Sequence, residues 1–358
     1  MKSVSVIIPA YNSQDKINIT IESLLSQTDL EFEIVFIDDG STDKTYDIIR
    51  NTLKESQFSN YKIIQQKNMG VSVARNKGIE ESENDYVYFL DADDYVSKKL
   101  IETLKIYINK NDVEVISWGY NEVRKDGYLL SNYSDSYEFI SRKLTGIYAL
   151  NEIIQKETLS IWTGSAIYSK SFLLRNNLKY TPDCRAGQDL EFIYKTLSKA
   201  ENVIFIDKIL SYYVRETDST TTSYNIRKFD AVFGIKRVAN YFRKSKVNDF
   251  YKLADYLEKN IMPIHYRFNF ISSYKQLEIN NDFLNIKKMK YFKSQIKKIY
   301  PNYPSLDKDM RHLLFNAREK NFKSFMINKI FAISPLIYMN LSDLRKKISW
   351  NIYLKIKL

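Results

Sequence analysis

The first 120 residues alternate between short apolar runs and longer segments whose apolar residues fall on one face. Residues 4–8 are rich in Val and Ile, which is typical of a strand buried on both faces. Further strands are predicted at 33–37, 62–65, 86–90 and 113–118. Helices are predicted by apolar spacing near 3.6 around 17–25 and over 42–53, 72–81 and 98–109. This alternation predicts an α/β fold with a largely parallel sheet and helices on both faces.

Small polar residues stand where two of these helices should begin. Asn12 or Ser13 is expected to cap the first helix, and Ser41 the second, because such side chains accept hydrogen bonds from free helical N–H groups. Another apolar helix is expected over 190–197. The ligand crevice of such a sheet lies at the carboxyl ends of its strands.

Charge and periodicity both change at about residue 226. Residues 226–358 contain 28 Lys+Arg and 10 Asp+Glu, a net charge of +18, whereas residues 1–225 carry −7 and the whole chain +11. The second part has helical spacing over 229–242, 249–260 and 287–299. We therefore expect a mainly helical, basic C-terminal module at 226–358.

Composition narrows the candidate chemistry. At 44% hydrophobic residues the chain is expected to bury a sizeable core. The single Cys184 cannot form an internal disulfide, and His265 and His312 are too few for a His/Cys zinc cage. Carboxylates are therefore the expected catalytic and metal-binding groups.

The chain start does not have the form of a signal peptide, so a cytoplasmic protein is expected. The longest apolar stretch, 330–341, is short and is interrupted by Pro335. Membrane contact is therefore expected to be peripheral. Aromatic, aliphatic and basic residues interleave over 320–357, as in interfacial helices.

Acidic residues follow two predicted strands. Asp91, Asp93 and Asp94 come directly after the strand at 86–90, where crowded carboxylates favour a hard cation such as Mn²⁺ or Mg²⁺. The alternative is an Asp-rich turn that caps the helix starting near Ser97. Asp38-Asp39-Gly40-Ser41 follows the second strand and suits hydrogen bonding to a ribose or a base. A turn and a cap would account for Gly40 and Ser41, but not for two adjacent Asp.

Two further segments contain charged residues beside glycine. Residues 67–78 lead into a helix bearing Arg75 and Lys77, which could face a diphosphate or simply be solvated. Gly187-Gln188-Asp189 precedes an apolar helix, so that Asp189 is either a helix cap or a functional carboxylate. Neither G-x-G-x-x-G nor G-x-x-x-x-G-K-S/T occurs, so dinucleotide and P-loop sites are unsupported.

Taken together and in this order, these motifs resemble those of the family 2 glycosyltransferases of the GT-A fold. The likeness covers about residues 3–223 and includes the start at 4–12, Ser23-Leu24-Leu25-Ser26-Gln27-Thr28 and the acidic and glycine motifs above. The resemblance implies that Pro9, Tyr11, Asp39 and Arg75 line the nucleotide pocket. It also implies that Asp91 meets the ribose, Asp93 holds Mn²⁺ or Mg²⁺, and Asp189 is the catalytic base. One departure is Gln188, where the family often has Glu.

The resemblance implies an inverting, metal-dependent glycosyltransferase that uses a nucleotide-sugar, with UDP as the expected nucleotide. The nucleotide-binding half would span about 1–118 and the acceptor half about 119–225, with acceptor candidates Trp162, Thr163, Gly164 and Tyr168. The expected partners are a glycan or lipid-linked acceptor in capsule or cell-wall synthesis and the anionic inner face of the membrane. Self-association through the C-terminal module is an open possibility, and no nucleic-acid partner is expected. The alternative is a non-catalytic sugar-nucleotide- or nucleic-acid-binding protein.

Overall fold

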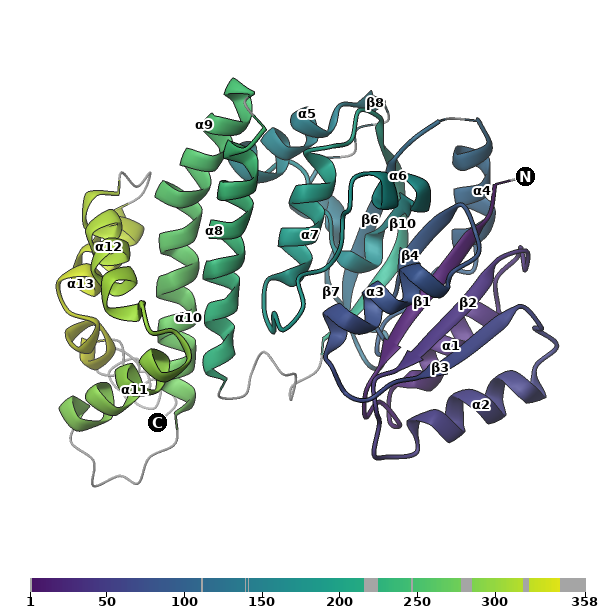
Figure 1. Cartoon of the computed structure of the whole chain (residues 1–358), viewed down its shortest axis with the longest axis horizontal. Coiled ribbons are helices and arrows are strands. Elements are labelled where there is room, and N and C mark those ends of the chain that lie inside the picture. The colour runs from purple at the N-terminus through teal and green to yellow at the C-terminus, as the bar shows by residue number, and fades with distance from the viewer. Residues whose placement is uncertain are drawn as a thin grey trace, which may run out of the picture.

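The computed structural model describes residues 2–110, 112–138, 140, 142–215, 225–245, 247–277, 285–317 and 322–341. Within them, ten strands form one sheet in the order β3-β2-β1-β4-β9-β6-β10-β5, with β7 beside β6 and β8 beside β10 (Figure 1). The strands are β1 Val4–Ala10, β2 Glu33–Asp38, β3 Tyr61–Gln65, β4 Tyr86–Phe89, β5 Tyr95–Val96, β6 Val115–Arg124, β7 Leu129–Ser131, β8 Lys143–Leu144, β9 Ala166–Ser169 and β10 Val203–Arg215.

The sheet is largely parallel, as predicted. Strands β1 to β4 run parallel to one another, and β6 runs parallel to β10, while β9 is antiparallel to both β4 and β6. Because β1, β2 and β4 point the same way, the segments that follow them meet at one edge of the sheet. These segments carry the acidic motifs.

Alternate residues of the buried strands pack into two separate hydrophobic cores, one on each face of the sheet. On β1, Ile7 packs into one core, while Val6 and Ile8 pack into the other. The second core is covered by α1, α2 and α4, and the first by α3, α6 and α7. These helices are α1 Ile17–Leu25, α2 Thr45–Glu55, α3 Val71–Glu81, α4 Leu100–Lys110, α6 Lys170–Arg175 and α7 Gln188–Leu197.

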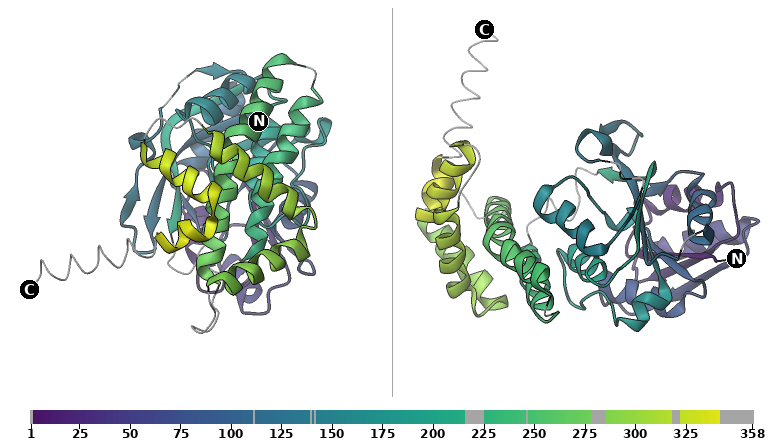
Figure 2. Two further views of the ribbon diagram at one scale, coloured as in Figure 1. Left: turned by 90° about the vertical axis from the view of Figure 1, so that its left-hand side faces the viewer. Right: turned by 90° about the horizontal axis from the view of Figure 1, so that it is seen from above.

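The C-terminal part is helical, and its core is continuous with the sheet. Figure 2 shows α8 and α10 as a layer between the sheet side and the outer helices. Phe192 of α7, Phe229, Tyr266 and Phe331 all belong to the core that also contains Ile7. Its helices are α8 Asp230–Arg243, α9 Asn248–Tyr256, α10 Met262–Gln276, α11 Asn285–Ile299, α12 Tyr303–Asn316 and α13 Phe322–Ile333, whereas α5 Gly146–Asn151 lies between β8 and β9. None of the helices in the described ranges is both long enough and apolar enough to span a bilayer.

The predicted helix caps at Asn12, Ser13 and Ser41 are wrong. Helix α1 begins at Ile17 with Lys16 as its N-cap residue, and α2 begins at Thr45 after Lys44. The small polar residues instead join the two preceding loops: Ser41 Oγ accepts from the Asn12 N–H at 3.0 Å. Thr45 Oγ1 likewise accepts from the Ser13 N–H at 2.7 Å. Contacts between loops therefore replaced local capping, and they fix the segment after β1.

We predict that Gly78→Ala destabilises the protein, because a β-carbon at Gly78 would lie 2.1 Å from Ile7 Cγ2. Ile7 is fully buried and stiff, so α3 would have to move away from β1. Overpacking of this kind costs about 1–3 kcal/mol of unfolding free energy. Urea denaturation followed by circular dichroism measures it, with the neighbouring Lys77→Ala as the control. Equal midpoints for the two variants would contradict the predicted contact.

Candidate active site

The predicted nucleotide-pocket residues lie around the carboxyl ends of β1 and β2. Pro9 is buried within β1 and pairs in register with Ile37. Tyr11 follows the end of β1 and is 50% exposed. Asp39 follows β2, and its N–H donates to the Ala10 carbonyl at 2.8 Å. An exposed aromatic ring and a buried carboxylate therefore lie on adjacent strand ends.

Asp39 organises the loop that leads into α3. The carboxylate is 3% exposed and accepts from Gln66 Nε2 at 2.7 Å, from the Met69 N–H at 2.9 Å and from the Gly70 N–H at 2.7 Å. Gly70 has φ +90°, a conformation that favours glycine. A nucleotide base that hydrogen-bonds Asp39 would therefore have to share or replace these bonds.

Arg75 lies at the centre of the site. Its side chain is 2% exposed, and Nη2 donates to Asp91 Oδ1 at 2.7 Å while Nη1 donates to Asp189 Oδ1. Its guanidinium also lies 5.0 Å from the centre of the Tyr180 ring. Burial alone would lower the pKa of Arg75, but the charges of Asp189 and Asp91 raise it above its ordinary value. The structure thus brings together three predicted site residues from α3, the β4 end and α7.

Asp189 is the second residue of α7. The residue that caps this helix is Gly187, with φ +73°, so the interpretation of Asp189 as a helix cap is wrong. Burial is the largest influence on the Asp189 carboxyl and raises its pKa above the ordinary value, although 35% of its side-chain surface remains accessible. The charge of Arg75 opposes this rise. A carboxylate with a raised pKa that substrate can reach is suited to accept a proton.

Asp93 contacts Lys16, a residue outside the Arg75 cluster. Its side chain is 40% exposed, and Oδ2 lies 3.7 Å from Lys16 Nζ. Both residues line a cavity of about 300 Å³ that also includes Lys125 and Val214. In the described part of the chain, no three His, Cys, Asp or Glu side chains form a metal-binding group. Any ion at Asp93 would therefore need further ligands from a substrate.

Asp94 has a structural environment. It is fully buried, its Oδ1 accepts from the Val214 N–H at 2.8 Å, and its main-chain carbonyl accepts from Thr20 Oγ1 at 2.7 Å. Burial, together with the charges of Asp93 and Asp91, raises its pKa well above the ordinary value. Asp94 therefore joins the acidic loop to β10 and α1.

Two residues near the predicted site have no signal in the sequence. Lys16 pairs with Asp93 across 77 positions of the chain, and Tyr180 lies beneath Arg75 and stacks on Phe192 at 4.1 Å between ring centres. Neither belongs to a motif, so only the folded arrangement identifies them. Gln188, the departure from the family pattern, has a buried Oε1 that no described residue hydrogen-bonds.

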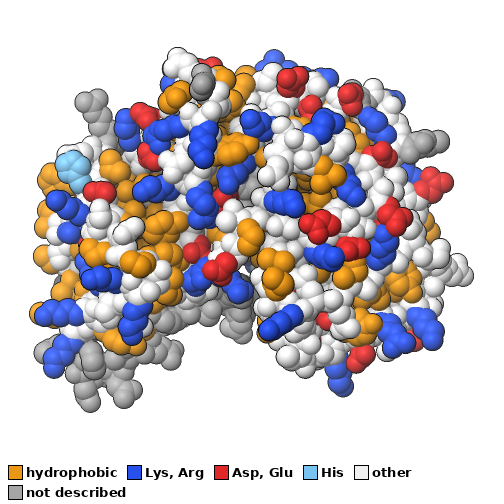
Figure 3. All heavy atoms as spheres, viewed as in Figure 1, with side chains coloured by type: hydrophobic (Ala, Val, Ile, Leu, Met, Phe, Trp, Pro, Cys, Tyr) orange, Lys and Arg blue, Asp and Glu red, His pale blue; other side chains and the backbone are white. Residues whose placement is uncertain are grey.

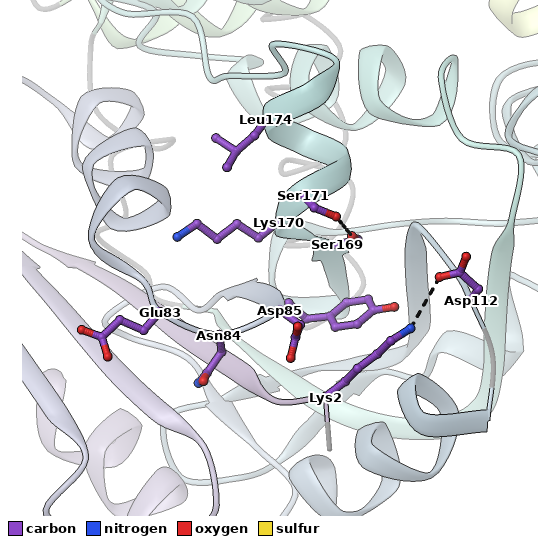
Figure 4. Close-up of a pocket in the computed structure, with 10 residues that line it drawn as sticks. Lys2, Glu83, Asn84, Asp85, Asp112, Ser169, Lys170, Ser171 and Leu174 are labelled. Carbon is purple, nitrogen blue, oxygen red and sulfur yellow. Dashed lines mark hydrogen bonds and ion pairs between the residues drawn. The ribbon is translucent and has the colours of Figure 1, made fainter.

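A second cavity, of about 330 Å³, lies at the opposite ends of β1 and β4 (Figure 4). Its charged groups are engaged by protein: Lys2 Nζ lies 3.5 Å from Asp112 Oδ1, and Lys170 Nζ donates to the Ser82 carbonyl. None of the predicted site residues lines it. The acidic sheet edge remains the candidate active site.

Comparison with solved structures identifies the fold. The S. aureus TarS 1-349 structure in complex with UDP-GlcNAc matches with a TM-score of 0.63 at 20% identity, covering 92% of this chain and 90% of that one. The TarS 1-349 structure in complex with UDP matches with a TM-score of 0.61 at 21% identity, over the same shares of the two chains. The predicted GT-A fold followed by a helical region is therefore confirmed.

Sequence comparison relates this chain to known glycosyltransferases. The uncharacterized glycosyltransferase EpsJ of Bacillus subtilis is 30% identical over 220 residues, 61% of this chain and 62% of that protein. The poly(ribitol-phosphate) beta-N-acetylglucosaminyltransferase TarP of Staphylococcus aureus is 27% identical over 228 residues, 63% of this chain and 66% of that protein. The match thus spans about three fifths of EpsJ, and residues 5–174 match the family model described as Glycosyl transferase family 2. Residues 5–174, a little under half of the chain, therefore carry the sequence pattern of glycosyl transferase family 2.

Proposed function

We propose that this chain is an inverting, metal-dependent glycosyltransferase that moves a sugar from a UDP-sugar to a hydroxyl of a glycan acceptor. The observation that carries the proposal is the buried Arg75, which holds Asp91 and Asp189 in one cluster beside the Asp39 loop. A residue suited to bind the donor thus lies next to one suited to accept a proton. The raised pKa of Asp189 favours a catalytic role over binding alone.

Asp189 would act as general base. The acceptor oxygen attacks the anomeric carbon as its proton passes to Asp189, and the bond from that carbon to the diphosphate oxygen breaks with its electron pair leaving on the diphosphate. Arg75 orients the Asp189 carboxylate through its hydrogen bond to Oδ1. Attack from the face opposite to the leaving group inverts the anomeric centre.

The chemistry around Asp93 fits a hard divalent cation. An ion such as Mn²⁺ or Mg²⁺ commonly binds one or two carboxylates and completes its shell with substrate phosphates and water. Asp93 is accessible and borders a cavity of about 300 Å³. When bound, the ion would neutralise charge that develops on the departing diphosphate.

Aromatic residues beside the base suit a carbohydrate acceptor. Trp162 lies 5.4 Å from Tyr120 and 5.2 Å from Tyr213 between ring centres, and all three residues are partly accessible. The next residue, Thr163, has a hydroxyl that lowers the pKa of Asp189. Aromatic faces pack against the C–H surface of a sugar or polyol, so we assign the acceptor to this side, within the predicted half at 119–225.

The identity of the donor is supported by relatives. TarS 1-349 binds UDP-GlcNAc in a solved complex, and TarP is named as a beta-N-acetylglucosaminyltransferase of poly(ribitol-phosphate). We therefore propose a UDP-N-acetylhexosamine or UDP-hexose donor and a polymer of the cell wall or capsule as acceptor. A lipid-linked acceptor would place the enzyme at the inner face of the membrane.

Helix α11 has a basic, partly apolar outer face that suits an anionic membrane. Lys287, Lys290, Lys297 and Lys298 are exposed there, and none forms an ion pair with another described residue. Ile286, Tyr291 and Ile299 are also exposed, at 58%, 45% and 43%. Figure 3 shows hydrophobic and basic side chains side by side over the helical part. Residues 320, 321 and 342–357 of the predicted interfacial segment lie outside the described residues.

We predict that Asp189→Asn abolishes sugar transfer while UDP still binds, because the amide keeps the shape but cannot accept the proton. Loss of a general base typically lowers the rate about 100- to 10,000-fold. Mass spectrometry of products from a panel of UDP-sugars measures transfer, and calorimetry measures UDP binding. The exposed Asp207→Asn is the matched control. More than a tenth of the wild-type rate in Asp189→Asn would overturn the assignment.

Chelation should inactivate the enzyme. After EDTA treatment, Mn²⁺ or Mg²⁺ should restore donor hydrolysis better than Zn²⁺, since oxygen ligands favour hard ions. Asp93→Ala should lose both activity and the metal-dependent gain in UDP affinity. Asp15→Ala, an exposed carboxylate in the same cavity, should lose neither. Full activity after exhaustive chelation would refute a metal role for Asp93.

We predict that changing Lys287, Lys290, Lys297 and Lys298 to Gln weakens sedimentation with anionic phosphatidylglycerol vesicles at least tenfold. Each lysine near such a surface contributes about 1 kcal/mol. The matched control changes four exposed lysines of the N-terminal part to Gln, at Lys44, Lys54, Lys98 and Lys99. Truncation of the chain after Tyr303 would be a poorer test, because it would remove Met310, Leu314 and Phe331 from the main core and destabilise the fold. Equal binding by both quadruple variants would show that the four lysines of α11 do not contact the membrane.

A further inference from the structure

Helix α8, in the helical C-terminal part, contacts the segment that carries Asp189. A β-carbon added to Gly187, two residues before Asp189, would lie 2.7 Å from Ala231 Cα and 2.9 Å from Ala231 Cβ. The backbone at the start of α7 thus packs directly against the first turn of α8. A shift of α8 would therefore also move the start of α7.

Next to this contact, one carboxylate collects hydrogen bonds from three parts of the chain. Asp230, the first residue of α8, is 7% exposed. Its Oδ2 accepts from the Arg185 N–H at 2.9 Å and from Arg227 Nε at 2.9 Å, and its Oδ1 accepts from the Tyr300 hydroxyl at 2.5 Å. The Arg185 bond is the one that reaches the loop before α7, whereas Tyr300 comes from beyond α11.

The same helix contacts α7 again two residues after Asp189. Glu191 is 2% exposed and accepts from Arg237 of α8, from Nε at 2.9 Å and from Nη2 at 2.6 Å. Lys195 and Thr181 complete its hydrogen bonds at 2.6 and 2.8 Å. A buried carboxylate with charged partners holds its geometry well, because leaving it unpaired would be costly. Asp189 therefore lies between two contacts, at Gly187 and Glu191, that hold its segment against α8.

We propose that Asp230 is a positioning residue for Asp189, and that through it the helical C-terminal part sets the reaction geometry. The inference rests on the proposed function, because it assumes that Asp189 is the base. Asp230 acts through the Arg185 main chain and Gly187, and it need not touch substrate. Tyr300 holds Asp230 from the other side, with its ring stacked on Phe233 at 4.7 Å between centres. The outer helices thus contribute to catalysis without entering the active site.

Asp230→Ala tests the proposal, with hydrolysis of UDP-GlcNAc in Mn²⁺ as the assay on the full chain. A misplacement of about 1 Å can cost about 100-fold in rate, so we expect kcat to fall by about that factor. The Kd for UDP should change much less than kcat, because Asp230 is linked to the Asp39 loop indirectly, through Arg185, whose guanidinium lies beside Gly70. Asp230→Asn should recover most of the rate, since its amide oxygen can still accept from the Arg185 N–H while its NH₂ group faces Tyr300.

Two further variants separate positioning from general stability. Tyr300→Phe keeps the ring stack but removes the hydroxyl, so it should lower kcat severalfold with UDP affinity unchanged. Arg243→Gln, on the same α8, breaks contacts to Asp255 at 3.0 Å and Glu258 at 2.7 Å and should leave kcat unchanged even if the melting temperature falls. A loss of kcat in Arg243→Gln as large as in Tyr300→Phe would overturn the proposal.

Failure of this proposal can be told apart from failure of the proposed function. If Asp189→Asn is inactive but Asp230→Ala keeps wild-type kcat, Asp189 remains the base and only the role of Asp230 is lost. If Asp189→Asn keeps the wild-type rate, Asp189 is not the base, and the positioning role proposed for Asp230 is then also wrong. A UDP affinity that drops in parallel with kcat in Asp230→Ala would point to general disruption and would also overturn the positioning role.

Discussion

A single buried guanidinium holds the candidate active site together. Arg75 has almost no contact with solvent, and a buried charge is tolerated only when it is paired and hydrogen-bonded. Asp91 and Asp189 supply that pairing. The requirement fixes the relative positions of α3, the loop after β4 and the start of α7. A shift of α3 would leave the buried charge unpaired, and a shift of either carboxylate would leave one end of the guanidinium without its hydrogen bond. The need to pair the buried charge of Arg75 therefore brings the residues of the site together.

Much of the fold could be predicted from the sequence because its signals are local. Apolar runs such as 33–37 and 86–90 identified buried strands, and the parallel arrangement predicted that the acidic residues after them lie at one edge of the sheet. The caps predicted at Asn12 or Ser13 and at Ser41 do not form, because contacts between the loops, which local sequence does not reveal, take their place. The pairing of Arg75 with Asp189 joins residues 114 positions apart, a distance over which periodicity carries no information. The roles of the site residues remain predictions.

The helical part differs from the sheet part in charge, but the two parts share one hydrophobic core. Its charge sets it apart from the front of the chain, yet its apolar residues join the core beneath one face of the sheet. Phe229, Tyr266 and Phe331 belong to the same buried cluster as Ile7 and Phe89. Charge therefore describes the surface that this part presents to solvent, while its interior is shared with the sheet.

This shared interior limits how such enzymes can be recombined. A chimera that joins the front of this chain to the helical part of a relative at about residue 225 would cut through one continuous set of aromatic contacts and separate Glu191 from Arg237. A crossover ahead of α7 would transfer that helix and α8 as a matched pair. Exchange of the helical part between relatives, in the laboratory or in evolution, should therefore favour breakpoints upstream of Gly187.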